Sequence, residues 1–166
     1  MSTHIDPNQA LQGSLIDRLI DDDPEALNDP PISRGAHLDR FRTALRRDIE
    51  ALLNAHQFCR RVPRELTELP ASLLDFGLPN FMGLTTAADE ARDRFRGEVE
   101  NVLRRFEPRF KRIAVSLVDT PGASERTLRL RIEGLVHANP APEPILFDSR
   151  LDPTVQRFSV TSVMRD

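Results

Sequence analysis

The segment Phe106-Glu107-Pro108-Arg109-Phe110 lies where a helical pattern of apolar residues changes into a strand pattern. Before it, apolar residues recur at helical spacing, and after it they alternate with polar residues as in a half-buried strand. Proline lacks a backbone N–H and restricts the residue before it, so Glu107 should lie at the helix end. Glu107 and Arg109 then place opposite charges around a rigid corner. This pattern favours a contact surface in a protein assembly.

Length and composition limit the class of protein. A chain of 166 residues has the usual size of one domain, and 39% hydrophobic residues suffice for a modest core. The formal net charge of −3 argues against a dedicated nucleic-acid binder, which is normally basic. No apolar run approaches the ~20 residues that span a bilayer, and the N-terminus lacks the features of a secretory leader. With Cys59 as the single cysteine, we expect a cytoplasmic protein without an internal disulfide.

Residues 1–37 predict a flexible acidic arm, which prolines interrupt and which cannot hold a core alone. Within the arm, residues 14–20 form a short amphipathic island with Ser14 as its expected N-cap. Leu15 and Leu19 lie on its apolar side, and we expect them to bind a groove on a partner. The alternative is that the island packs on its own domain, and the sequence favours neither. Residues 38–166 should form a single folded domain.

Three helical segments are expected before the sheet. The first spans residues 38–54 and carries an apolar stripe opposite a charged face. Residues 68–83 follow as a compact apolar elbow, whose helical turn Gly77 closes in the left-handed conformation. The last helix should follow Thr86 as its N-cap and continue to Phe106.

From residue 111 onward the pattern has a period of two. Residues 111–119 and 127–136 should form a hairpin, with residues 121–124 as its turn. After a proline-rich break, residues 145–148 and 155–163 are expected as two shorter strands. The predicted fold class is therefore α+β, with N-terminal helices packed on a C-terminal antiparallel sheet. The residues expected to point inward in the second strand are Leu128, Leu130 and Ile132.

Several phrases of this sequence occur together in one known family. In this order they resemble the TssE-type baseplate subunits of bacterial type VI secretion systems, a family that includes the wedge protein of contractile-tailed phage baseplates. The resemblance extends from about Leu15 to Val163, and the ordered set is more specific than Glu-Pro-Arg alone. The phrases are Arg46-Arg47-Asp48-Ile49-Glu50-Ala51-Leu52-Leu53-Asn54, Leu69-Pro70-Ala71-Ser72-Leu73-Leu74, Phe76-Gly77-Leu78-Pro79-Asn80-Phe81, Phe106-Glu107-Pro108-Arg109, and Phe147-Asp148 with Leu151-Asp152.

The resemblance implies a structural subunit that needs no catalytic residue, cofactor or metal. Its partners would be the TssF and TssG proteins of a baseplate wedge and the TssB/TssC sheath, with TssK as a further candidate. Six wedges would surround the tail tube at the cytoplasmic side of the inner membrane, without inserting into it, and the subunit would help to start sheath assembly. The family's Glu-Pro-Arg motif falls on Glu107, Pro108 and Arg109, which we assign to the wedge contact. The sheet could also offer an edge to sheath strands.

Three alternatives stay open at this point. An enzyme is the first, since proteins of this family have carried lysozyme-like labels. A glycosidase needs two carboxylates at a defined separation in a cleft, however, and no catalytic phrase singles out such a pair here. The second is a regulatory binding module of the anti-adaptor type, because that fold also occurs in such a protein and fold alone does not decide function. The third concerns the motif itself, because Glu107 could simply contact Arg109 within the chain.

Overall fold

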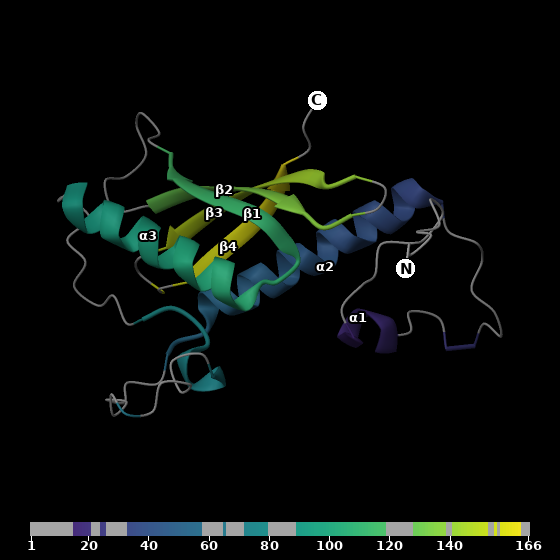
Figure 1. Ribbon diagram of the computed structural model, residues 1–166, viewed down its shortest axis with the longest axis horizontal. Helices are drawn as coiled ribbons and strands as arrows, with labels where there is room; N and C mark the ends of the chain where they lie inside the picture. The colour runs from purple at the N-terminus through teal and green to yellow at the C-terminus, as the bar shows by residue number, and fades with distance from the viewer. Residues whose placement is uncertain are drawn as a thin grey trace.

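The computed structural model places two long helices on one face of a four-stranded sheet (Figure 1). It describes residues 15–20, 24–25, 33–57, 65, 72–79, 89–118, 128–138, 141–152, 155 and 157–163. The predicted α+β class, with helices before the sheet, is confirmed. The helices are α1 (Leu15–Leu19), α2 (Arg34–Asn54), the 3-10 helix η2 (Leu73–Asp75) and α3 (Asp89–Phe106). The strands are β1 (Phe110–Leu117), β2 (Leu128–Val136), β3 (Glu143–Asp152) and β4 (Arg157–Val163).

Helix α2 begins one turn before its predicted start at residue 38. The side chain of Ser33 accepts a hydrogen bond from the N–H of Ala36 and caps the helix. Residues 35–37 carry no apolar periodicity, so the pattern alone did not extend the helix to them. The predicted end at Asn54 is confirmed. The expected apolar stripe is Leu38, Phe41, Leu45, Ile49, Leu52 and Leu53; all of these are buried except Leu38, which is half-buried.

The elbow after α2 is fixed to the end of that helix. Gly77 has a φ of 101°, as predicted for a left-handed closing residue. The side-chain amide of Gln57 donates hydrogen bonds to the carbonyl oxygens of Asp75 and Gly77, at 3.2 and 3.1 Å. The following residue, Leu78, is fully buried. Residues 80–88, including the predicted cap Thr86, lie outside the described residues.

The sheet has the order β1-β2-β3-β4, and each neighbouring pair is antiparallel. The predicted hairpin corresponds to β1 and β2, although its turn at residues 121–124 lies in a part of the chain that the structure does not describe. The three inward positions predicted for β2 are buried. The predicted pairing of these two strands and the predicted inward face of β2 are therefore correct.

Strand β3 is longer than the predicted piece at residues 145–148, and β4 starts two residues later than predicted. As a central strand, β3 pairs with both β2 and β4, so pairing on two sides extends it to Asp152. Pro144 is tolerated inside β3 although proline has no N–H to donate. The pairing with β4 begins only at Leu146, so no hydrogen bond to β4 is required from Pro144. Neighbouring strands, rather than the local pattern, set these bounds.

One core joins the helices to the sheet. Helix α2 packs along β4 and α3 packs along β1 (Figure 1). The ring of Phe95 on α3 stacks on that of Phe158 on β4, with ring centroids 6.1 Å apart. Phe147 on the central strand β3 is fully buried between the layers. The corner between α3 and β1 is thereby held beside α2, which brings residues of both elements together.

Candidate functional site

The predicted corner is present at the end of α3. The N–H of Glu107 donates to the carbonyl oxygen of Leu103 at 3.0 Å, which is the last helical hydrogen bond. Pro108 and Arg109 form a turn, and β1 starts at Phe110. Because proline cannot continue the helix, the chain changes from helix to strand within three residues. The predicted position of Glu107 at the helix end is confirmed.

Glu107 and Arg109 contact each other through two parallel hydrogen bonds. Nε of Arg109 donates to Oε1 of Glu107 at 2.6 Å, and Nη2 donates to Oε2 at 2.5 Å. Glu107 is only 6% exposed, and the side chain of Arg109 is 18% exposed. The two residues therefore form a buried, bidentate ion pair, which is the contact within the chain that the sequence left open.

This pair continues into a longer chain of charges. Nη2 of Arg109 also donates to Oδ2 of Asp48 on α2 at 2.7 Å. The other oxygen of Asp48, Oδ1, accepts from Nη2 of Arg47 at 3.0 Å, and the same nitrogen reaches Oδ1 of Asp17 on α1 at 2.7 Å. We call these five residues the charge chain. It links the Glu-Pro-Arg corner to α1, although the two lie some ninety residues apart in the sequence.

The arginines of the charge chain stay charged throughout the accessible pH range. Burial by itself lowers the pKa of Arg109, but hydrogen bonds and charge from Glu107, followed by those from Asp48, outweigh it and raise that pKa. The pKa of Arg47 is also raised, first by its hydrogen bond to Asp17 and then by that to Asp48. Nη1 of Arg109 is buried and bonds to no residue in the described part of the chain.

Helix α1 shows its apolar side to solvent. Asp17 points to Arg47 of α2, whereas Leu19 is 74% exposed and Ile16 and Ile20 are also exposed. For Leu15 the structure describes the backbone within α1 and not the side chain. The island is therefore attached to the domain by a polar contact, and the three apolar side chains described here do not enter the core.

The sequence of this chain matches one family model. That model, described as baseplate wedge protein gp25, matches residues 39–141, which is more than half of the chain. The chain belongs to the gp25 family of baseplate wedge proteins. This family includes TssE, so the resemblance stated from the sequence is confirmed. Neither the curated proteins nor the solved structures contain a match.

Membership of the gp25 family assigns the chain a structural role in the baseplate of a contractile tail. The family is a structural one and not a known enzyme class. Within the described ranges, no group of His, Cys, Asp or Glu is arranged to hold a metal ion. No helix among the residues that the structure describes is long and apolar enough to cross a membrane.

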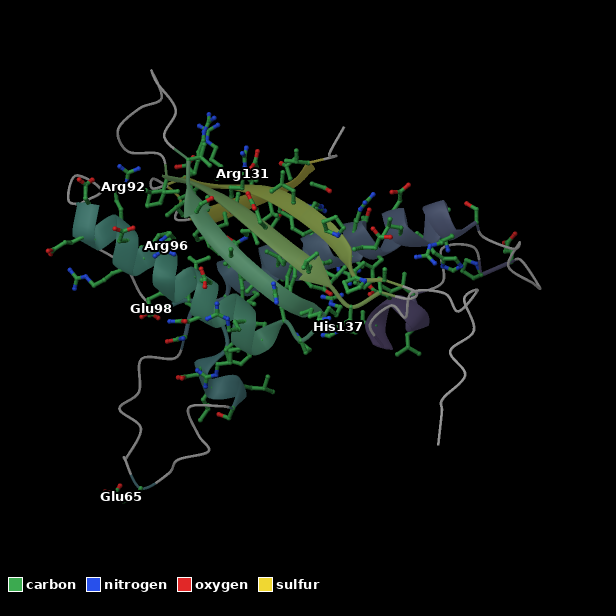
Figure 2. All side chains as sticks on the ribbon, turned by 45° about the horizontal axis from the view of Figure 1, so that its top comes forward. Glu65, Arg92, Arg96, Glu98, Arg131 and His137 are labelled. Carbon is green, nitrogen blue, oxygen red and sulfur yellow. The ribbon has the colours of Figure 1, made fainter. Side chains whose placement is uncertain are left out.

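An open groove of about 1010 Å³ lies over the sheet, and no residue of the charge chain lines it. Its lining combines apolar residues such as Leu135 and Leu146 with several arginines, among them Arg131, which Figure 2 labels on the sheet. Two carboxylates line it, Glu133 and Glu143. None of the binding residues predicted from the sequence lines this groove.

Three members of the charge chain, Asp17, Arg47 and Asp48, were not singled out as binding residues by the sequence. Arg47 and Asp48 were assigned only to the charged face of the helix at residues 38–54. Arg47 and Asp48 lie inside one of the segments on which the family resemblance rests. That position was the one feature of the sequence that could have marked them as functional. Their partners could not be predicted, because Arg109 lies 61 residues after Asp48.

Proposed function

We propose that this chain is the TssE-type baseplate subunit of a type VI secretion system, located at the cytoplasmic side of the inner membrane. It joins the TssF and TssG wedge proteins to the first ring of the TssB/TssC sheath and helps to start sheath assembly, with TssK as a further neighbour. It acts as a single folded domain, residues 38–166, preceded by a flexible arm, and it has no catalytic activity of its own. Family membership supports the baseplate role.

The charge chain is the observation that carries this proposal. It places Glu107, Pro108 and Arg109 close to α1, so the binding residues assigned from the sequence belong to one region. Arg109 keeps part of its side chain accessible and has one nitrogen, Nη1, without a described partner. Because Nη1 is buried, a carboxylate or carbonyl oxygen of a wedge protein would complete its hydrogen bonds only if the side chains around the corner shift on binding.

Helix α1 supplies the apolar part of the same contact region. Leu15 and Leu19 are the residues that we assign to a groove on the wedge proteins, since Leu19 is exposed and burying it would stabilise the complex. The Asp17–Arg47 ion pair orients the helix, but a surface pair contributes only ~0–1 kcal/mol. We therefore expect α1 to move easily when a partner binds it.

The first test is co-expression with the TssF and TssG proteins of the same genome, followed by size-exclusion chromatography. The native chain is compared with the double variant Glu107→Ala, Arg109→Ala. Removing both charges avoids leaving a buried charge unpaired, and Asp48 keeps its contact with Arg47. A second double variant, Asp39→Ala with Arg42→Ala, removes an exposed ion pair of α2 and serves as the matched control.

We expect the native chain and the control to co-elute with TssF and TssG, and the motif variant to elute alone. Circular dichroism shows that each variant is folded. Co-elution of the motif variant would contradict the wedge contact and make the pair purely structural. Failure of the folded native chain to co-elute would contradict the TssF/TssG contact. Binding of a response-regulator-like adaptor would then favour the anti-adaptor alternative.

A further inference from the structure

The sheet has two edge strands, β1 and β4. An edge strand carries backbone N–H and C=O groups that point away from the sheet and can pair with a strand from another chain. Proteins prevent unwanted pairing by covering these groups or by placing charges beside them. In this chain the helices that pack against the sheet also reach both of its edges.

On β4, side chains of α2 form hydrogen bonds with the backbone N–H and C=O groups of two alternate residues. The N–H of Phe158 donates to Oδ1 of Asn54 at 2.8 Å, and its carbonyl oxygen accepts from Nδ2 of Asn54 at 3.0 Å. The N–H of Val160 donates to Oε2 of Glu50 at 3.2 Å, and its carbonyl oxygen accepts from Nη1 of Arg46 at 3.3 Å. We call Arg46, Glu50 and Asn54 the β4 clamp.

On β1, side chains of α3 repeat the same arrangement. The N–H of Val115 donates to Oε2 of Glu100 at 3.2 Å, and its carbonyl oxygen accepts from Nη1 of Arg96 at 3.3 Å. Arg96 is labelled on α3 in Figure 2. We call Arg96 and Glu100 the β1 clamp. Both clamps thus use an arginine and a glutamate four residues later, and the two side chains also pair with each other.

Helix and strand geometry explain why this spacing works. Residues 46, 50 and 54 lie on one side of α2, and each step of four residues rises about 6 Å along the helix. Alternate residues of a strand, whose backbone groups point to the same side, lie about 6.8 Å apart. Side chains spaced four residues apart on a helix can therefore bond to the backbone of every second residue of an edge strand. An added strand would use the same backbone groups.

We propose that the two clamps take the place of a further strand on each side and close the sheet of the free subunit to strand addition, including pairing with a second copy of this chain. A strand that is added at β4 must first displace Arg46, Glu50 and Asn54 from the backbone of Phe158 and Val160. The free subunit is therefore a monomer whose β4 edge opens only when the clamp is released.

Hydrogen exchange measured by NMR tests whether the clamps protect the edges. In the native chain the amides of Phe158, Val160 and Val115 should be protected, although each belongs to an edge strand. Glu50→Ala should raise the exchange rate of Val160 roughly fivefold, because one hydrogen bond contributes about 1 kcal/mol. Glu50→Gln keeps an acceptor oxygen and should preserve the protection. Rapid exchange of Phe158 and Val160 in the native chain would overturn the proposal.

Strand addition itself is tested with a fluorescently labelled peptide of residues 157–163, the sequence of β4. We expect the double variant Glu50→Ala, Asn54→Ala to bind the peptide, measured by fluorescence anisotropy, and to form dimers in light scattering as concentration rises. The native chain should do neither. Glu98→Ala, on α3 (Figure 2), removes one negative charge without touching either edge and is the matched control.

The outcome is read only from variants that circular dichroism shows to be folded. If the double variant does not fold, the single variant Glu50→Ala replaces it, because it frees the N–H of Val160 and keeps both contacts of Asn54 with Phe158. A folded variant that stays monomeric and binds no peptide would overturn the proposal. So would peptide binding by the native chain at the same concentration.

Discussion

Among the single side chains, Arg109 contributes to more than one contact. It holds the carboxylates of Glu107 and Asp48, and its guanidinium lies 5.9 Å from the ring centre of Phe41. A buried charge whose partner is removed loses both the Coulomb attraction and its hydrogen bonds. The motif therefore stabilises the corner between α3 and β1 in addition to the wedge contact that we propose for it.

Arg109→Ala should lower the free energy of unfolding by about 3 kcal/mol, because Glu107 is left buried without its cation. Urea unfolding followed by circular dichroism measures this change, since the chain has no Trp or Tyr for intrinsic fluorescence. Arg42→Ala removes an i,i+3 pair with Asp39 and should cost less than about 0.5 kcal/mol. Equal stability of the two variants would contradict the structural role of the corner.

Among the helices and connections, the elbow and α1 differ in how firmly they are held. The elbow is attached through Gln57 and by an ion pair between Arg105 and Asp75 at 3.2 Å, and its Leu78 enters the core. Helix α1 is attached through Asp17 and exposes its apolar side. Substitutions in the elbow should therefore change stability, and substitutions in α1 should change binding.

Gly77→Ala should destabilise the fold by about 1–3 kcal/mol. Its φ of 101° is unfavourable for alanine, and an added Cβ would lie 2.3 Å from the carbonyl oxygen of Ala55. Gly97→Ala is the control, because a Cβ there meets no atom within 4 Å. This second substitution should stabilise α3 by about 0.5–1 kcal/mol, since alanine favours a helix. Thermal unfolding compares the two, and a rise in Tm for both would refute this explanation.

Leu19→Ser should leave the free energy of unfolding within about 0.5 kcal/mol of the native value, because the side chain is exposed. It should weaken binding to the wedge proteins roughly tenfold or more, since burying a leucine contributes about 1.5–3 kcal/mol. Val155→Ser changes an exposed apolar residue next to β4 and should not affect binding. Surface plasmon resonance with the purified wedge complex measures both, and equal affinities would refute the assignment of α1.

In the molecule as a whole, α2, α3 and the sheet share a single hydrophobic core. Buried residues of both helices and all four strands belong to it. The charge chain and the two clamps add polar contacts around this core. The charge chain and the β4 clamp join elements that are far apart in the sequence, whereas the β1 clamp joins the consecutive elements α3 and β1. Unfolding should therefore be cooperative, and the helices should not persist without the sheet.

Phe147→Ala should destabilise the protein by about 3–5 kcal/mol, because the ring is fully buried and its removal leaves a cavity. Hydrogen exchange in α2, α3 and the sheet should increase together in this variant. Leu73→Ala, at an 84% exposed position, should change stability by less than about 0.5 kcal/mol. Faster exchange confined to the sheet of the Phe147 variant would show that the helices and sheet do not share one cooperative core.

Much of the fold was predictable because it follows local rules. The apolar stripes, the end of α3 before Pro108, the conformation of Gly77 and the inward positions of β2 each depend on a few neighbouring residues. The start of α2 and the length of β3 were predicted less well. A side-chain cap set the first, and pairing on both sides of a central strand set the second.

The sequence therefore determined the fold class, the corner at Glu107 and the family, since these follow from periodicity, proline chemistry and an ordered set of phrases. The roles of Asp48, Glu50 and Asn54 were decided only by the three-dimensional arrangement. Periodicity separates apolar residues from polar ones, but a polar residue that faces water has the same pattern as one that bonds a strand edge. Its partner lies far away in the sequence and is brought near only when the common core forms.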